Sequence, residues 1–439
     1  MYDWLISAPI LIKVMTTLGL ILVINALCRQ LAVSIGVGIV TLAVWSGHPT
    51  ATAIQLAADR LTAIDNLMLL LIVFQVIWLS SQMSETGLME ELVSGVRARV
   101  SREGAMAVLP AVIGFLPMPG GALFSAPLVD SCDAEDHVGG LLKAQANHWF
   151  RHVWEYWWPL YPGVLLAMDI TGFAVWQMML MGVPLTIGAV TAGYLFILRP
   201  IARREKHPHA AAGGEGGRLM RPLLPIIVVV AAYAVIRLGH GVARWAGAPL
   251  PPMNRYLPMA VGLAFAMLTL QNIHPLPGKK WRDILLSRRT LNLVIIVAAV
   301  RVYGAFIEAD LPGGVPLVDK MRAEMVQWGI PMLAVIMLLP LVSGLATGLS
   351  IGFVGASFPI VLKLVPETAP FGELLSVTVL AYGCGYMGML ISPVHVCLIV
   401  TCEHFEQAVP RPILRMARPA TMVILWAVTL HFLWQWLLV

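Results

Sequence analysis

Residues 10–27 read ILIKVMTTLGLILVINAL, an apolar run long enough for a helix to cross a membrane. A helix rises about 1.5 Å per residue, so roughly 20 apolar residues span a hydrocarbon core of about 30 Å. In lipid every backbone polar group needs an internal partner, which favours helices. Similar runs follow at 31–48, 64–83, 146–170, 175–198, 222–240, 256–272, 291–309, 376–402 and 419–438. We therefore predict an all-α integral membrane protein with about ten transmembrane helices.

The composition supports a membrane protein. Of the 439 residues, 59% are hydrophobic and only 12% are charged, which leaves too little polar surface for a soluble globule. The net charge is +5, but the Lys and Arg residues gather in short loops, as expected of the cytoplasmic side of a membrane protein. We therefore expect lipid contact and no nucleic-acid partner. The five cysteines show no CxxC spacing and are expected to be small buried hydrophobes.

Two further apolar stretches, 104–130 and 330–362, are rich in Gly and Pro near their middle. Each is expected to enter the membrane and return on the same side as a re-entrant hairpin. With that choice, the four most basic loops fall on one side, and both termini face the exterior of the cytoplasmic (inner) membrane. These loops are Arg97 to Arg102, Arg199 to Arg221, Lys279 to Arg289 and Arg411 to Arg418.

The two halves of the chain resemble each other in order. Asn66 and Asn292 open matching runs at an offset of 292 − 66 = 226, and Pro159 answers Pro393 at 393 − 159 = 234. An odd number of spans per half would insert the second copy upside down, as in many secondary transporters. The alternative is chance similarity between Leu-, Gly- and Pro-rich segments. We predict an N-terminal repeat (1–198), a basic cytoplasmic linker (199–221) and a C-terminal inverted repeat (222–439).

The hairpin tips are candidate binding elements. Glycines there expose backbone amides, and hydroxyls add polar groups to the second tip. The alternative is that the glycines only allow close helix packing, which we prefer for Gly352 and Gly355. The predicted substrate-binding residues are Pro119, Gly120, Gly121 and Ser125 in the first hairpin, and Ser343, Thr347, Gly348 and Ser350 in the second.

The run 147–163, NHWFRHVWEYWWPLYPG, places charges beside two prolines. Asn147, Arg151 and Glu155 share one helix face, and His148 and His152 share a neighbouring one. Asn147 and Arg151 are predicted to bind substrate, with Arg151 as the candidate to hold a substrate carboxylate. Glu155, His148 and His152 are candidates for ion or proton coupling. The alternative places the run at the interface, where Arg151 snorkels beside an aromatic belt.

The spacing of His148 and His152 also resembles a helical zinc site, but Trp149 occupies the position of the general base. No metal site, cofactor or enzymatic activity is therefore predicted. In the second half, the broken helix around Pro393 offers Ser392 for substrate and His395 for coupling, although a packed histidine is the commoner role. Arg301 is expected to pair with Glu308 or with a backbone carbonyl.

The Pro-Met-Pro-Gly-Gly hairpin at 117–121, the run from Arg151 to Gly163 and the segment from Gly388 to His395 resemble the bacterial and archaeal family "domain of unknown function 401". That family is grouped with the ion transporter superfamily, whose members carry carboxylates, gluconate or arsenite, or exchange sodium for protons. The resemblance implies a homodimer with a scaffold and a moving transport domain. It names no substrate, and the hairpin tips lack the paired Ser-Asn-Thr pattern of sodium-coupled carboxylate carriers.

These features predict a secondary transporter that moves a small anionic, carboxylate-like solute by alternating access, coupled to Na⁺ or H⁺. The basic surroundings of the hairpins and Arg151 favour an anion. An ion channel or a non-transporting signalling protein is the first alternative, and an intramembrane metallo-hydrolase is the second.

Overall fold

The computed structural model describes residues 8–97, 100–115, 121–133, 137–202, 220–312, 314–366 and 368–439. Within these ranges the protein is helical, and the only β-type pairing is an isolated bridge between Asp310 and Pro316. The first half contains α2 (Ile10–Cys28), α3 (Leu31–Trp45), α4 (Thr50–Thr62), α5 (Ile64–Glu85), α6 (Leu88–Arg97), α7 (Arg102–Gly114), α8 (Ala122–Ser131), α9 (Gly140–Arg151), α10 (Pro162–Thr171), α11 (Val175–Gly193), a π-helical turn (Tyr194–Leu198) and α12 (Arg199–Ala202).

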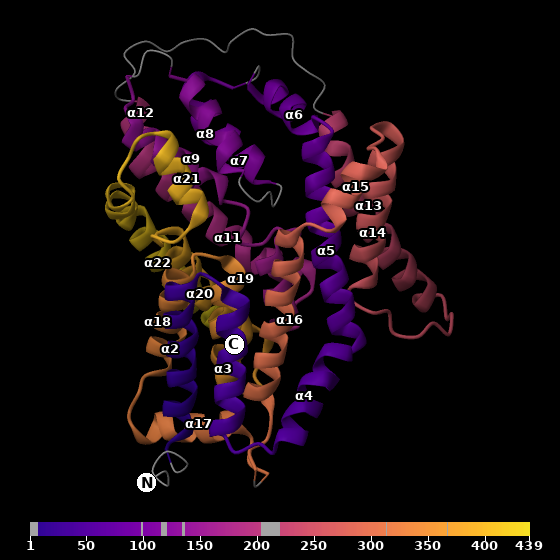
Figure 1. The fold of residues 1–439 in the computed structure, drawn as a ribbon, viewed down its shortest axis with the longest axis vertical. Coiled ribbons are helices and arrows are strands. Elements are labelled where there is room, and N and C mark those ends of the chain that lie inside the picture. Colours follow the sequence, from indigo (N-terminus) through magenta and orange to yellow (C-terminus); the bar gives the residue numbers. More distant parts are fainter. Residues whose placement is uncertain are drawn as a thin grey trace.

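The second half contains α13 (Met220–Trp245), α14 (Leu257–Ile273), α15 (Gly278–Leu285), α16 (Arg288–Glu308), α17 (Leu317–Gln327), α18 (Met332–Thr347), α19 (Ser350–Val361), a 3₁₀ turn (Leu362–Leu364), α20 (Phe371–Leu390), α21 (Val396–His404) and α22 (Pro410–Leu438). Figure 1 shows the helices in one elongated body, with α6 and α12 near one end of the long axis and α17 near the other.

Seven helices in the described part of the chain are long and apolar enough to cross a membrane, and an eighth span is possible if the bent pair α17–α18 counts as one. The axes of that pair differ by 115°. Large apolar side chains stay exposed on these helices, including Val235 at 69% and Trp245 at 90% on α13. Exposed apolar surface on this scale fits contact with lipid rather than with water. The chain is thus a multi-pass membrane protein.

Two of the expected spans are wrong as continuous helices. The run 146–170 falls on α9 and α10, which are separated by irregular residues 152–161, and the run 376–402 falls on α20 and α21. Pro159 and Pro393 lie in these interruptions. Proline lacks the backbone N–H and clashes with the preceding turn, so neither helix continues through it.

The hydrophobic core contains buried residues from both halves of the chain. Helix α20 is buried along nearly its whole length, packing against α18 on one side and α22 on another (Figure 1). Helices α18 and α19 are joined only by Gly348 and Leu349, and Gly348 has a φ of +62° that favours glycine. They therefore form a tight helical hairpin over 332–361. In the first half α7 packs against α8, and the intervening tip at 116–120 lies outside the described residues.

Candidate functional site

The two interrupted helices come from opposite halves of the chain but lie against each other. Tyr382 and Tyr386 on α20 donate hydrogen bonds to the backbone carbonyls of Glu155 (2.6 Å) and His152 (2.7 Å). These carbonyls belong to the irregular segment after α9. Among the described residues the carbonyl of Glu155 has no backbone donor, and that of His152 has only the N–H of Glu155, at 3.3 Å. Because an unpaired buried carbonyl is costly, the tyrosines of one half stabilise the interruption in the other.

The first half in turn supplies a hydrogen bond to the interruption in the second half. The Nε2 atom of His148 on α9 lies 2.9 Å from the carbonyl oxygen of Leu390, the last residue of α20. Ser392 donates to the carbonyl of Leu345 on α18 at 2.6 Å, so it binds the hairpin rather than a solute. Both interruptions are thus fixed by side chains from elsewhere in the fold, which makes them rigid enough to form a site.

A cavity of 360 Å³ opens between these interruptions and the hairpin of α18 and α19. Helices α5 and α16 form one wall, through Ile77, Asn292, Leu293 and Ile296. The other residues come from the two interruptions and the hairpin turn: Arg151, His152, Glu155, Tyr161, Pro162, Gly348, Leu349, Ser350, Ile351, Met389, His395, Val396 and Cys397. The size of the cavity suits a small molecule, and its few polar groups converge on one region.

Arg151 places a cation in this cavity. It is only 4% exposed, and its Nη1 atom lies 4.0 Å from the Sγ atom of Cys397. Gly121, at the start of α8, lies so close to the guanidinium that a Cβ atom there would collide with it. Any larger residue at that position would require the guanidinium to shift. Gly121 thus brings the start of α8 into direct contact with Arg151.

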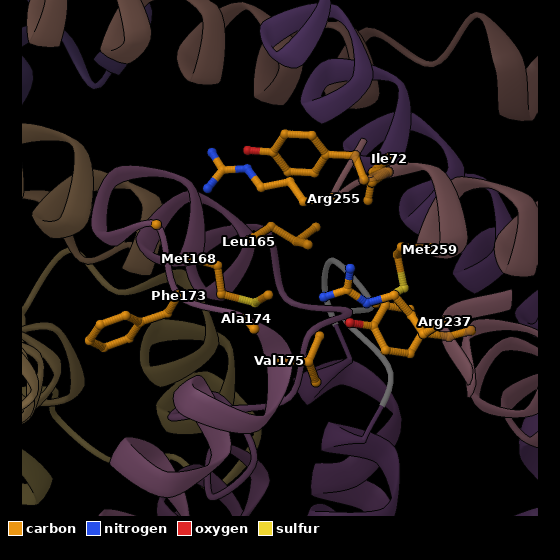
Figure 2. Close-up of a pocket in the computed structure, with 12 residues that line it drawn as sticks. Ile72, Leu165, Met168, Phe173, Ala174, Val175, Arg237, Arg255 and Met259 are labelled. Atoms are coloured by element: carbon orange, nitrogen blue, oxygen red, sulfur yellow. The ribbon is translucent and has the colours of Figure 1, made fainter. Parts of the chain in front are cut away.

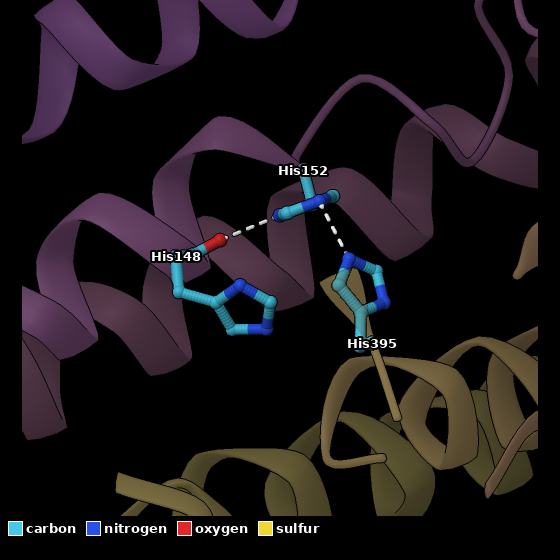
Figure 3. Close-up of side chains that lie close together, drawn as sticks. All are labelled: His148, His152 and His395. Carbon is cyan, nitrogen blue, oxygen red and sulfur yellow. Dashed lines mark hydrogen bonds between the residues drawn. The ribbon is translucent and has the colours of Figure 1, made fainter. Parts of the chain in front are cut away.

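Three histidines meet beside Arg151. Figure 3 shows His148 and His152 from α9 and its C-terminal end facing His395, which precedes α21. Their ring centroids are 4.8–5.0 Å apart, and all three are buried. Glu155 extends the cluster, with its Oε1 atom 3.8 Å from the Nε2 atom of His152. The sequence indicated the pair on one helix face but gave no sign that His395 would join it.

Several predicted residues do not face the cavity. Asn147 donates to the hydroxyl of Thr401 at 2.9 Å. Ser343 and Thr347 donate to carbonyls one turn back in their own helix, at 2.7 and 2.8 Å. Ser125 is fully buried within α8. Hydroxyls inside an apolar helix commonly bond their own backbone in this way, which leaves Gly348 and Ser350 as the hairpin residues at the cavity. Pro119 and Gly120 lie outside the described residues.

Three cavity residues with hydroxyl, amide or thiol groups were not predicted as site residues. Cys397 was expected only to fill space, although it follows His395 by two positions. Tyr161 and Asn292 also line the cavity, and the proline-rich run and the repeat comparison had drawn attention to their neighbourhoods. The sequence thus drew attention to the segments that contain these residues, but it did not show that the segments would contact one another in the fold.

The expected partner of Arg301 is wrong. Its Nη1 atom lies 2.5 Å from Oδ2 of Asp169 on α10, while Glu308 pairs with Arg60. Asp169 is completely buried and also binds Arg255 at 2.7 Å. A buried carboxylate needs cationic partners of this kind. Arg255 borders a second cavity of 150 Å³, which Figure 2 shows with its mainly apolar lining.

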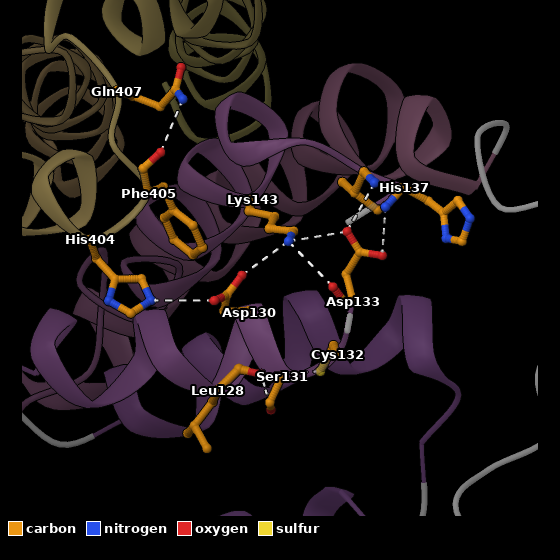
Figure 4. Close-up of polar contacts among 11 residues, drawn as sticks. Leu128, Asp130, Ser131, Cys132, Asp133, His137, Lys143, His404, Phe405 and Gln407 are labelled. Atoms are coloured by element: carbon orange, nitrogen blue, oxygen red, sulfur yellow. Dashed lines mark hydrogen bonds and ion pairs between the residues drawn. The ribbon is translucent and has the colours of Figure 1, made fainter. Parts of the chain in front are cut away.

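A separate charge cluster joins α8, α9 and α21 (Figure 4). Lys143 on α9 lies 3.0 Å from Asp130 and 3.2 Å from Asp133, and His404 lies 3.9 Å from Asp130. Burial alone would raise the pKa of Asp133, but hydrogen bonds from the backbone N–H groups of Val138 and His137 and from Lys143 outweigh it, so that its pKa is lowered. These ion pairs hold together the ends of α8, α9 and α21 that lie away from the cavity.

Nearly the whole chain matches the model of a known protein family. The model for "Protein of unknown function (DUF401)" matches residues 10–248 and 259–433. No curated protein matches the chain. The chain therefore belongs to the DUF401 family of proteins of unknown function.

Proposed function

We propose that this protein is a secondary transporter of the ion transporter superfamily that binds a small anionic, carboxylate-like solute in the 360 Å³ cavity and moves it by alternating access. The observation that carries the proposal is the convergence of both interrupted helices and a hairpin turn on one cavity that contains Arg151. Irregular backbone at membrane depth is tolerated where it is buried in protein or lines a cavity, and transporters use such segments to bind solutes.

The order of elements supports the predicted inverted repeat. In each half a pair of long helices is followed by a short helix, a long helix, another short helix, two hairpin helices, an interrupted helix and a final long helix. Thus α2–α11 corresponds to α13–α22. Gly114 and Gly344 are equivalent in this arrangement, and each lets its hairpin helix touch the backbone of the interrupted helix beside it, at Arg151 and Gly385. We propose that 104–130 and 330–362 are re-entrant.

The cavity suggests how access alternates. Its wall on α5 and α16 is apolar apart from Asn292, whereas the charged groups lie on the interrupted helices. We propose that α7–α11 and α18–α22 form the moving transport domain, and that the remaining helices form a scaffold that supports a homodimer. The protein would lie in the inner membrane of a bacterium or archaeon, with both termini outside and the basic loops in the cytoplasm.

Glu155, His148, His152 and His395 are the candidates for coupling to H⁺ or Na⁺, and no enzymatic activity is proposed. Arg151 favours an anionic solute because guanidinium pairs well with a carboxylate, particularly where water is excluded. A channel is the alternative function. It would need a continuous polar pore, whereas the mixed lining of this cavity is bounded by packed helices.

The test is binding and uptake by the purified protein. Thermal unfolding is measured with a panel of small carboxylates, sugar acids and oxyanions, at several sodium concentrations and pH values, because a ligand of the folded state raises the melting temperature. Compounds that raise it are then tested for saturable uptake into proteoliposomes. Saturable uptake that Arg151→Gln abolishes, and that the exposed control Arg244→Gln retains, supports a carrier. Ionic current that does not saturate, in a protein that none of the compounds stabilises, would instead indicate a channel.

A further inference from the structure

Three buried histidines, His148, His152 and His395, meet beside the cavity, and anion binding by Arg151 does not explain why they meet. Their candidate ligand atoms all lie within 4.8 Å of one another, and the side chains are at most 5% exposed. They come from two segments more than 240 positions apart, His148 and His152 from one interruption and His395 from the other. Three imidazoles brought together in this way are chemically suited to a transition-metal ion.

Hydrogen bonds to backbone carbonyls set which ring nitrogen is free in His148 and His152. The Nδ1 atom of His152 lies 2.6 Å from the carbonyl oxygen of His148, and Nε2 of His148 lies 2.9 Å from that of Leu390. A carbonyl only accepts, so each of these nitrogens carries the hydrogen. The remaining nitrogens, Nε2 of His152 and Nδ1 of His148, therefore hold lone pairs. Metal-binding histidines are typically oriented by such a bond from the second ring nitrogen.

The free nitrogens have suitable positions. The Nε2 atoms of His152 and His395 are 3.2 Å apart, close to the spacing of about 3.3 Å between two ligands of a tetrahedral zinc ion with Zn–N distances of about 2.0–2.1 Å. Closing the largest separation to that spacing needs a shift of about 1.5 Å. Because Nε2 of His152 holds a lone pair, Nε2 of His395 donates the hydrogen between them when no metal is bound. Metal binding therefore requires His395 to carry its hydrogen on Nδ1, which has no hydrogen-bond partner among the described residues. Nδ1 of His148 is buried and has no hydrogen-bond partner among the described residues, and a bound metal would supply that partner.

We propose that His148, His152 and His395 bind a divalent transition-metal ion of the zinc class at the wall of the cavity. Its fourth coordination position would face Glu155 and the open cavity, because Glu155 lies 3.8 Å from His152 and lines the same space. Three protein ligands with one open position are the arrangement in which zinc accepts a further ligand. This departs from the sequence analysis, which predicted no metal.

The charges around the site indicate what the open position would accept. With neutral imidazoles, a dication, Arg151 and an ionised Glu155 give a charge of 2 + 1 − 1 = +2 in the cavity wall. Buried charge of one sign requires compensation, and an anionic solute would supply it. This last step rests on the proposed function: the metal and Arg151 together would bind the carboxylate or oxyanion group of the transported solute. The metal site itself does not depend on transport.

The experiment uses the full-length protein, purified without a histidine tag, stripped with a chelator and titrated with Co²⁺ and with Zn²⁺. We expect one bound ion per chain and the intense visible absorption of a tetrahedral cobalt centre. His152→Gln and His395→Gln should each weaken binding about 100-fold or more, the scale on which even supporting residues of metal sites act. His431→Gln is the matched control, since His431 is also buried and bonds a single backbone carbonyl, that of Ser376.

Spectra of the unmodified protein keep the test valid even if a histidine variant fails to fold. The site is overturned if the stripped wild-type protein takes up no cobalt. It is also overturned if the bound cobalt is octahedral and His431→Gln lowers its binding as much as His152→Gln and His395→Gln do. Stoichiometric metal binding without any anion uptake in proteoliposomes would retain the site and overturn the transport proposal. Anion uptake that is unchanged in stripped protein would retain the transport proposal and overturn the role of the metal in it.

Discussion

The two interrupted helices occupy equivalent places in their halves of the chain but differ in chemistry. The end of α9 carries Arg151 and the segment after it carries Glu155, whereas the segment between α20 and α21 contributes no charged side chain and only His395 to the cluster. Their architecture is shared and their charge is not. A cavity between them is therefore polar on one side, which orients a charged solute toward the first half. The two interruptions are thus alike in their broken backbone, while the charged groups that could bind an anion come from the first half alone.

The largest effect is expected where the two halves are alike. Gly114→Ala and Gly344→Ala would each place a Cβ atom against backbone, at Arg151 in the first half and at Gly385 and Met389 in the second. Backbone cannot move aside as a side chain does, so we expect both variants to lose about 3 kcal/mol or more of stability and to yield little folded protein. Yield and size-exclusion profiles measure this. Gly239→Ala in α13 is the control, because its added methyl group meets no atom within 4 Å. Normal folding of both hairpin variants would refute the close contact.

The next largest effect concerns the difference between the halves. Arg151→Gln removes the cation beside the first interruption. We expect it to lower the affinity for the stabilising solute about 100-fold, since losing one partner of a buried charge pair costs about 2–5 kcal/mol. Arg151→Lys should retain part of the affinity, because lysine keeps the charge but loses the bidentate geometry. Solute-dependent melting temperatures measure both. An unchanged dose response in Arg151→Gln would show that the anion binds elsewhere.

A smaller effect is expected from the charge cluster at the far ends of α8 and α9. The pKa of Asp133 is lowered in the folded protein, so its contribution to stability is present above the ordinary pKa of an aspartate, about 4, and is lost as the pH falls through the lowered value. Asp133→Asn should cost about 1.5–3 kcal/mol at neutral pH and should flatten the acid side of the stability profile. Thermal melts between about pH 3 and pH 7 measure this. A variant with the acid profile of the unmodified protein would contradict the assignment.

The smallest effects should separate the hydrogen bonds that join the halves. Tyr382→Phe and Tyr386→Phe each remove a donor to a carbonyl of the first interruption, and we expect each to cost about 1 kcal/mol of stability. Tyr194→Phe, at an exposed position, should be neutral. Equilibrium unfolding in mixed micelles gives the comparison. Equal stability of all three variants would mean that the carbonyls find other partners.

The sequence predicted the elements of this fold better than their contacts. Apolar runs located most of the long helices, because length and hydropathy decide which segments cross a bilayer. The short helices α4 and α15 were missed, since neither has an apolar run of that length. The interruptions were suggested by Pro159 and Pro393, yet the spans containing them were still drawn as single helices. Proline marks a probable break but does not give its extent.

The candidate site was predictable in part for the same reason. Arg151, His152, Glu155 and His395 were selected because charged and ionisable groups are costly in a membrane, and all four line the cavity. The hydroxyls of Ser343 and Thr347 were selected because they lie near the tip of the second hairpin, but they bond their own helix. The pairing of Asp169 with Arg301, and the meeting of His395 with His148, depend on tertiary contacts between distant segments. Local pattern carries no information about such contacts.

The bonds between the interruptions also limit how the protein can move. If the segment after α9 separated from α20, the carbonyl of Glu155 would lose the hydroxyl of Tyr382 and face hydrocarbon without a partner, at a cost of several kcal/mol. The carbonyl of His152 would lose one of its two donors, the hydroxyl of Tyr386. We therefore expect the two interruptions to travel as one rigid body and the sliding surface to lie along α5 and α16. A cysteine cross-link between the interruptions should then leave turnover intact, whereas one from either of them to α16 should arrest it.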